Sequence, residues 1–242
     1  MSRTVPPEYE GLWRRTVIHR SSGVSDTTTR VWWFQSSRYH IDLRIPADRP
    51  HVADAGALAQ LTPAQLQRYA AQTGFAGVTE IDGTRCTWHP EIAFPAVSAE
   101  LDAGWMRFDS PDQLHETGLD SSYDEDWIRV SSDPLLGVRL EEIDGDAIAY
   151  LLIGAHWMAW ACGSNNFSAD SANPIHWSEF SVLQRQAHWT VTASNLPWRE
   201  GAHYAVEYLT VAHVRQWRAD AHIHIALAPD RHWRLVDSQL DA

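Results

Sequence analysis

The feature that most constrains the fold is the stretch from residue 26 to residue 45, DTTTRVWWFQSSRYHIDLRI. Two runs of β-branched and aromatic residues flank a Ser-Ser pair, and the second run alternates between apolar and charged side chains. Its apolar members are Tyr39, Ile41, Leu43 and Ile45. The residues between them are His40, Asp42 and Arg44, and side chains in a β-strand point to opposite faces with period two. The stretch therefore predicts two strands, the second with an apolar face and a charged face.

Short strand-like segments with turn signals between them continue along the chain. Asp82-Gly83 is a strong hairpin signal, and one short helix is predicted at about 63–73, because Thr62 can cap its start and Gly74 can end it. The segment 203–217 fits a helix and a strand almost equally, and its content of Tyr, Val and Thr favours strands. Many short strands with one helix are typical of closed antiparallel barrels.

The chain is predicted to consist of two units. The sequence Ser-Ser-Asp-Pro at 131–134 is the best candidate for a boundary. After it, the order of elements in the first half recurs: a strand containing Gly137, a turn rich in Asp and Gly, and a long apolar run from Ala147 to Cys162. We therefore expect a mainly β protein of two antiparallel barrels in tandem, residues 1–132 and 133–242.

Composition excludes several classes of function. The net charge of -12 opposes binding to nucleic acids and to anionic membranes, which attract cations. The 19 basic residues are all Arg, so chemistry that needs a Schiff-base lysine or a P-loop lysine is excluded. No glycine-rich phosphate loop or dinucleotide fingerprint is present, and no cofactor is expected. The 13 Trp residues predict either broad packing between sheets or a pocket walled by aromatic rings.

The sequence predicts a cytoplasmic protein. The N-terminal residues lack the apolar run of a signal peptide, and no stretch reaches the length of a membrane span. The two cysteines, Cys86 and Cys162, are too few for a disulfide framework and are expected to be buried thiols. The sequence leaves open whether the protein forms a homodimer.

Two short motifs resemble the lipocalin-like (calycin) pattern. Gly11 and Trp13 lie on the predicted opening strand, and Trp127-Ile128-Arg129 lies on the predicted closing strand of the first unit. In that superfamily, an Arg near the end of the barrel packs over the Trp at its start. The two-unit organisation is similar to a poorly characterised group of bacterial and fungal proteins built from two such barrels. The resemblance implies two lipocalin-like barrels in tandem, each a cup for an apolar or amphipathic small molecule.

The charged row of the second strand is the main candidate site. His40, Asp42 and Arg44 would supply a base, a carboxylate that orients it and a cation that grips an anionic group, if this row faces the barrel interior. If the row faces water, it is an ordinary solvated strand face. Other residues predicted to contact a ligand are Trp33, Trp88, His188 and Glu207.

A metal site is a weaker alternative. His222 and His224 share one face of a predicted strand, as pairs of zinc ligands do. A zinc site would need a third ligand, and the candidates are His188, His203 and Glu207. Ordinary exposed or hydrogen-bonded histidines explain the same pattern, so no metal is expected.

Three hypotheses for function follow from these patterns. The first is binding of a small, largely apolar molecule in a Trp-lined cavity, with Arg44 and a histidine holding its polar end. The second is a cofactor-independent lyase, isomerase or hydrolase that uses His40 and Asp42 for acid-base chemistry. The third is a structural or interaction module in which Trp residues join the two barrels.

Overall fold

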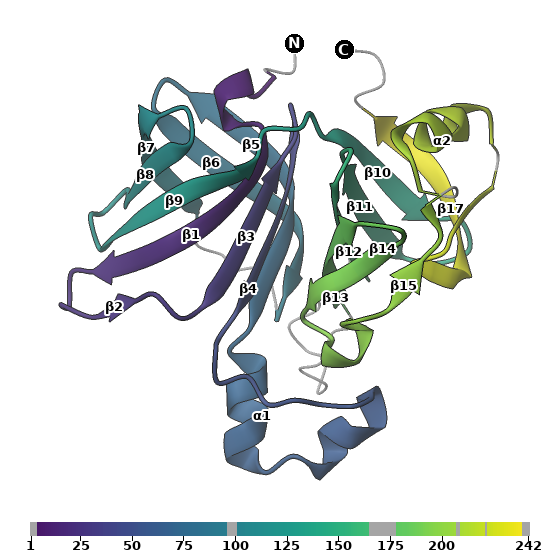
Figure 1. The fold of residues 1–242 in the computed structure, drawn as a ribbon, viewed down its shortest axis with the longest axis horizontal. Coiled ribbons are helices and arrows are strands. Elements are labelled where there is room, and N and C mark those ends of the chain that lie inside the picture. Colours follow the sequence, from purple (N-terminus) through teal and green to yellow (C-terminus); the bar gives the residue numbers. More distant parts are fainter. Residues whose placement is uncertain (1–3, 96–100, 165–177, 207–208, 221, 239–242) are drawn as a thin grey trace.

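The computed structural model describes residues 4–95, 101–164, 178–206, 209–220 and 222–238. It is mainly β, as predicted from the alternating segments. Figure 1 shows a closed barrel on one side and a curled sheet on the other, with the helix α1 (Pro63–Ala70) below them. Within the described residues, no helix combines the length and the apolar character that crossing a membrane requires.

The first unit is a closed antiparallel barrel. Its sheet has nine strands in the order β2-β1-β3-β4-β5-β6-β7-β8-β9, and β1 also pairs with β9, which closes the ring. The short β2 pairs with the end of β1. The strands are β1 (Gly11–Arg20), β2 (Ser25–Asp26), β3 (Arg30–Gln35), β4 (Tyr39–Ile45), β5 (Thr73–Asp82), β6 (Arg85–Phe94), β7 (Asp102–Ser110), β8 (Gln113–Gly118) and β9 (Tyr123–Ser131).

The second unit is a curled eight-stranded sheet of order β15-β14-β13-β12-β11-β10-β17-β16. In the part of the chain that is described, no pairing joins β15 to β16, so this unit is a half-barrel, where the sequence predicted a second closed barrel. Its strands are β10 (Leu136–Glu142), β11 (Ala147–Ile153), β12 (Trp157–Ser164), β13 (Ser178–Arg185), β14 (Trp189–Ser194), β15 (His203–Tyr204), β16 (Ile223–Ile225) and β17 (Ala228–Ser238).

The segment after β15 is partly helical, so the strand prediction for 203–217 is wrong beyond Tyr204. The helix α2 spans Val211–Gln216 and continues into the 3-10 helix η5 (Trp217–Ala219). The Thr210 side chain caps α2 by accepting from the His213 backbone N–H. Val214 and Trp217, three residues apart, are buried against the second sheet. Capping and burial of one helical face therefore outweighed the β propensity of this segment.

The two units share one hydrophobic core. The apolar row of β4 packs outward from the barrel, against residues of β11, β12 and β13 such as Tyr150 and Phe180. Tyr39 and Tyr150 meet edge to face with ring centroids 5.2 Å apart. An ion pair also joins the units, because Arg139 Nε of β10 lies 2.8 Å from Glu91 Oε2 of β6. The apolar face of the key strand is thus an interface between units.

Most of the buried Trp residues lie within one unit or the other. Trp13, Trp33, Trp88 and Trp127 form the aromatic core of the barrel, with the Trp33 ring centroid 5.7 Å from that of Trp88 and 5.8 Å from that of Trp127. A second buried group packs on the opposite side of the half-barrel: Trp160, Trp189, Trp217 and Trp233. At the junction of the units, the buried Trp is Trp32. Packing within one unit is therefore the role of most buried Trp residues, while Trp32 and the partly buried Trp157 and Trp198 pack at the junction of the units.

One end of the barrel is closed by the chain that precedes β1. The 3-10 helix η1 (Pro7–Tyr9) places Tyr9 in the barrel core, with its ring centroid 4.9 Å from that of Phe108. The Arg129 guanidinium lies 4.3 Å from the Trp13 ring centroid and donates to the backbone carbonyls of Glu8 and Glu10. This is the Arg-over-Trp contact that the resemblance implied.

The excursion between β4 and β5 connects the barrel to the second sheet. It contains the 3-10 helix η2 (Ala55–Gln60) and α1, where Thr62 forms the predicted capping box with Gln65. The Tyr69 hydroxyl of α1 donates to the Asn195 carbonyl, next to the 3-10 helix η3 (Pro197–Arg199), at 3.1 Å. These contacts hold the excursion against the edge of the half-barrel.

Candidate functional site

The charged row of β4 points into the barrel. His40 is fully buried, Asp42 is 2% exposed, and the Arg44 side chain is about one-third exposed at the end of the strand. The apolar residues between them are buried against the second sheet. The orientation on which the sequence-based site depended is therefore the inward one, and the barrel interior holds three polar or charged side chains from a single strand.

His40 belongs to a buried hydrogen-bond network at the closed end of the barrel. Its Nδ1 lies 3.0 Å from Thr79 Oγ1, and the Thr79 hydroxyl donates to Gln35 Oε1 at 2.8 Å. Because that hydroxyl proton is already used, His40 donates from Nδ1, and Nε2 is left as a buried acceptor without a partner in the described residues. Burial, with a smaller effect of His89, lowers the pKa of His40 to about 3. The imidazole is therefore neutral at pH 7.

Asp42 bonds to Arg44 and not to His40. Arg44 Nε donates to Asp42 Oδ1 at 2.8 Å. Burial raises the pKa of Asp42 to about 6, although the neighbouring Arg44 guanidinium lowers it. The prediction that Asp42 orients the imidazole is thus wrong, because the carboxylate pairs with Arg44 while the imidazole pairs with Thr79. A role for these residues in catalysis stays a prediction.

Two buried glutamates share the interior with Asp42, and the sequence analysis missed both. Glu116 of β8 is 3% exposed and accepts a hydrogen bond from the Tyr123 hydroxyl at 2.8 Å. Glu125 of β9 is 2% exposed; its Oε1 lies 2.6 Å from Arg15 Nη1, and its Oε2 is buried without a partner among the described residues. Burial raises the pKa of Glu116, and the charge of Glu125 raises it further.

Two glycines make room for this group. A Cβ atom at Gly104 would lie 2.8 Å from Glu116 Cγ, and a Cβ atom at Gly118 would lie 2.6 Å from the Tyr123 ring. Carbon atoms of real side chains do not approach this closely, so a side chain at either position would force Glu116 or Tyr123 to move. The absence of side chains at these two positions of β7 and β8 therefore lets the Glu116 and Tyr123 side chains lie together inside the barrel.

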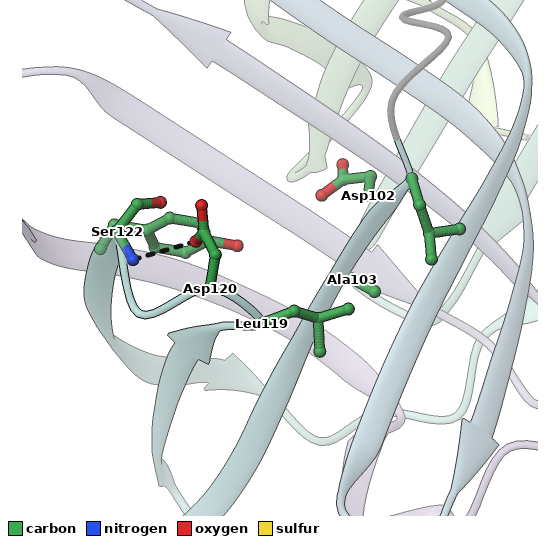
Figure 2. A pocket seen from close by; sticks show the side chains of 7 residues that line it. Asp102, Ala103, Leu119, Asp120 and Ser122 are labelled. Atoms are coloured by element: carbon green, nitrogen blue, oxygen red, sulfur yellow. Dashed lines mark hydrogen bonds between the residues drawn. The ribbon is translucent and has the colours of Figure 1, made fainter.

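A pocket of about 470 Å³ opens at the end of the barrel where β7 begins and the turn between β8 and β9 lies. Figure 2 shows the Asp102 and Asp120 carboxylates on two sides of it. Its lining residues are Leu101, Asp102, Ala103, Leu119, Asp120, Ser122 and Tyr123. Asp102 and Tyr123 also border the interior: Asp102 is in register with Trp88, and Tyr123 reaches Glu116. Burial raises the pKa of Asp102, while Arg44 lowers it and Glu125 raises it.

The remaining predicted site residues do not lie in this pocket. Trp33 and Trp88 lie deeper in the barrel, in the aromatic cluster. His188 is exposed in the turn between β13 and β14 of the second sheet, with its ring centroid 6.2 Å from that of His203. Glu207 lies outside the described residues.

The predicted histidine pair lies at the edge of the second sheet. His222 and His224 are both exposed, and the His232 ring of β17 has its centroid 4.7 Å from that of His224 and 6.5 Å from that of His222. Within the described residues, no group of three or more His, Cys, Asp or Glu side chains is arranged to hold a metal ion. The three rings form an aromatic cluster at the surface.

A signal for the missed residues was present in the sequence. The resemblance places Trp127 and Arg129 on the inward face of the closing strand. Because side chains alternate with period two, Glu125 and Tyr123 lie on the same face. The same alternation on β8 links the buried Leu114 with Glu116. Among the predicted site residues, those at 39–45 and the pair His222 and His224 were chosen by this rule, and the residues of β8 and β9 were not.

Comparison with known proteins supports the fold and names no function. No family model matches the chain, and no curated protein matches it. A crystal structure of the uncharacterized protein YLR301w from Saccharomyces cerevisiae has a similar fold, with a TM-score of 0.59 at 13% sequence identity. The match covers 94% of this chain and 98% of the yeast chain. The similarity therefore spans both units, while membership of the lipocalin-like superfamily stays a prediction.

Proposed function

We propose that the protein binds a small molecule at the open end of its barrel. The observation that carries this proposal is the pocket of about 470 Å³, whose lining residues Asp102 and Tyr123 also border a buried cluster of charged side chains. Ligand sites of this size typically combine apolar walls with a few polar groups that fix the orientation of the ligand. Titratable groups with displaced pKa values, such as Asp102, cluster at such sites.

The lining residues suggest how a ligand would be held. Leu101 and Leu119 are 57% and 37% exposed, and ligand binding would cover their apolar surface. Asp102 and Tyr123 stand between this surface and the interior, so the polar part of a ligand would point toward them. Arg44, predicted to grip the polar end of a ligand, pairs with Asp42, and its charge opposes the rise that burial causes in the pKa of Asp102.

Binding to a panel of small fragments tests this proposal. Saturation-transfer NMR would detect fragments that bind the full chain, and a Leu119→Trp variant would fill the pocket with a larger side chain. Leu66 on α1 is a matched control, because its exposure of 38% is almost that of Leu119. We expect hits that are lost in Leu119→Trp and kept in Leu66→Trp. Hits that survive Leu119→Trp, or a panel without hits, would contradict the proposal.

A second candidate is acid-base catalysis at the same end of the barrel. It is favoured by two buried carboxyl groups with raised pKa values, Asp42 at about 6 and Glu116, because a general acid or base works best near the operating pH. These groups would take the role that the sequence assigned to His40. Mass spectrometry of bound fragments would reveal turnover. Activity lost in Glu116→Gln and kept in His40→Gln supports this candidate, and the reverse result contradicts it.

A further inference from the structure

The charges at the open end of the barrel are unbalanced. Four carboxyl groups and two guanidinium groups lie between the pocket and the aromatic core: Asp42, Asp102, Glu116, Glu125, Arg15 and Arg44. Each guanidinium already has a carboxylate partner, Arg15 with Glu125 and Arg44 with Asp42. Glu116 holds its proton at pH 7, so three carboxylates face two guanidinium groups, and burying an uncompensated carboxylate is costly.

Two of these carboxylates have acceptor oxygens that no described residue satisfies. Glu125 Oε2 is fully buried and has no hydrogen-bond partner, and the whole residue is only 2% exposed. Asp102, which lines the pocket, makes no hydrogen bond or close ion pair within the described part of the chain. Glu125 lies two residues along β9 from Tyr123, on the same inward face and one step deeper than the pocket wall. A carboxylate without a partner among the described side chains thus lines the pocket, and a second carboxylate with an unsatisfied oxygen lies one step deeper.

The geometry points to an organic cation as the ligand: a protonated amine or a guanidinium group carried on a small apolar body. The cationic group would donate to Asp102 at the pocket wall, and the buried Glu125 carboxylate behind the wall would add electrostatic attraction, while Leu101 and Leu119 cover the apolar body. Charge-assisted hydrogen bonds of this kind are stronger than neutral ones. An anionic ligand would be repelled by the uncompensated carboxylate. The inference rests on the proposed binding function and specifies its ligand class.

Calorimetric titration of the full chain with three matched probes tests this inference. The probes 2-phenylethylamine, 2-phenylethanol and 3-phenylpropionate present a similar ring and differ in charge at pH 7. We expect the amine to bind at least about tenfold more tightly than the alcohol, and the carboxylate to bind more weakly than both. Because the attraction is electrostatic, the affinity for the amine should fall as salt is added.

Variants locate the charge that is responsible. Asp102→Asn should reduce the affinity for the amine about tenfold and leave the affinity for the alcohol unchanged. Asp144→Asn, at an exposed turn of the second sheet, is the matched control and should change neither. Equal affinities for the three probes, with binding lost in Leu119→Trp, would overturn the cation inference and keep the binding site. No binding of any probe would count against both. Amine binding that is unaffected by Asp102→Asn would place the cation elsewhere and overturn the inference.

Discussion

Replacing Glu116 by glutamine should change how stability depends on pH. Burial, followed by the charge of Glu125, raises the pKa of Glu116 from its ordinary value of 4.5 to about 8. The folded protein therefore holds this proton more tightly than the unfolded chain does. Linkage then requires that the stability contributed by this group is greatest below pH 4.5 and is lost as the pH rises toward 8. A shift of this size corresponds to a total loss of about 4–5 kcal/mol.

The substitution Glu116→Gln isolates this effect, because a glutamine side chain has nearly the same shape, can still accept from the Tyr123 hydroxyl and carries no charge. Urea unfolding between about pH 5 and pH 9 would give the free energy of unfolding of both proteins. We expect Glu116→Gln to be more stable than the wild type by less than about 1 kcal/mol at pH 5 and by about 4 kcal/mol at pH 9. Glu8→Gln, at an exposed glutamate, should show no such trend. A difference that stays constant across this pH range would refute the reasoning.

Three other substitutions test the packing and the closed end. Phe180→Ala removes a fully buried ring between the two units and should lower the free energy of unfolding by about 3–5 kcal/mol. A decrease of less than about 1 kcal/mol would mean that the units do not share a core. Arg129→Ala removes the guanidinium over Trp13 and its bonds to carbonyls, and should cost about 2–4 kcal/mol in the same assay, with Arg129→Lys intermediate. His40→Gln should remove a loss of stability of about 2 kcal/mol that the wild type shows between about pH 8 and pH 5, because the unfolded chain gains a proton at His40 in this range and the folded protein, with the pKa of His40 lowered to about 3, does not; an unchanged pH dependence would contradict the buried, neutral imidazole.

Period-two alternation predicted much of the barrel and part of its site. It placed His40, Asp42 and Arg44 on one face of β4, and the structure turns that face inward. Sequence could not show that Asp42 pairs with Arg44 while His40 pairs with Thr79. Those partners come from other strands or depend on rotamers, as with Thr79, which is 39 residues away from His40.

The predictions for the second unit and for the Trp residues were incomplete for physical reasons. The second half repeats the order of elements of the first, but its sheet is not closed within the described residues, because closure depends on pairing between strands distant in sequence. At Arg139, where the first unit has Trp13, the side chain turns to Glu91 of the barrel. The large number of Trp residues favoured packing between sheets but was also compatible with a pocket wall. Only the distances between rings showed that Trp33 is enclosed by other indoles.

A crystal structure of the full chain soaked with 2-phenylethylamine would show whether the pocket at the open end of the barrel binds an organic cation. We predict density for the probe in the pocket beside Leu119, with its ammonium group within hydrogen-bond distance of Asp102. Density for the probe only at other surfaces, with this pocket filled by solvent, would contradict the account.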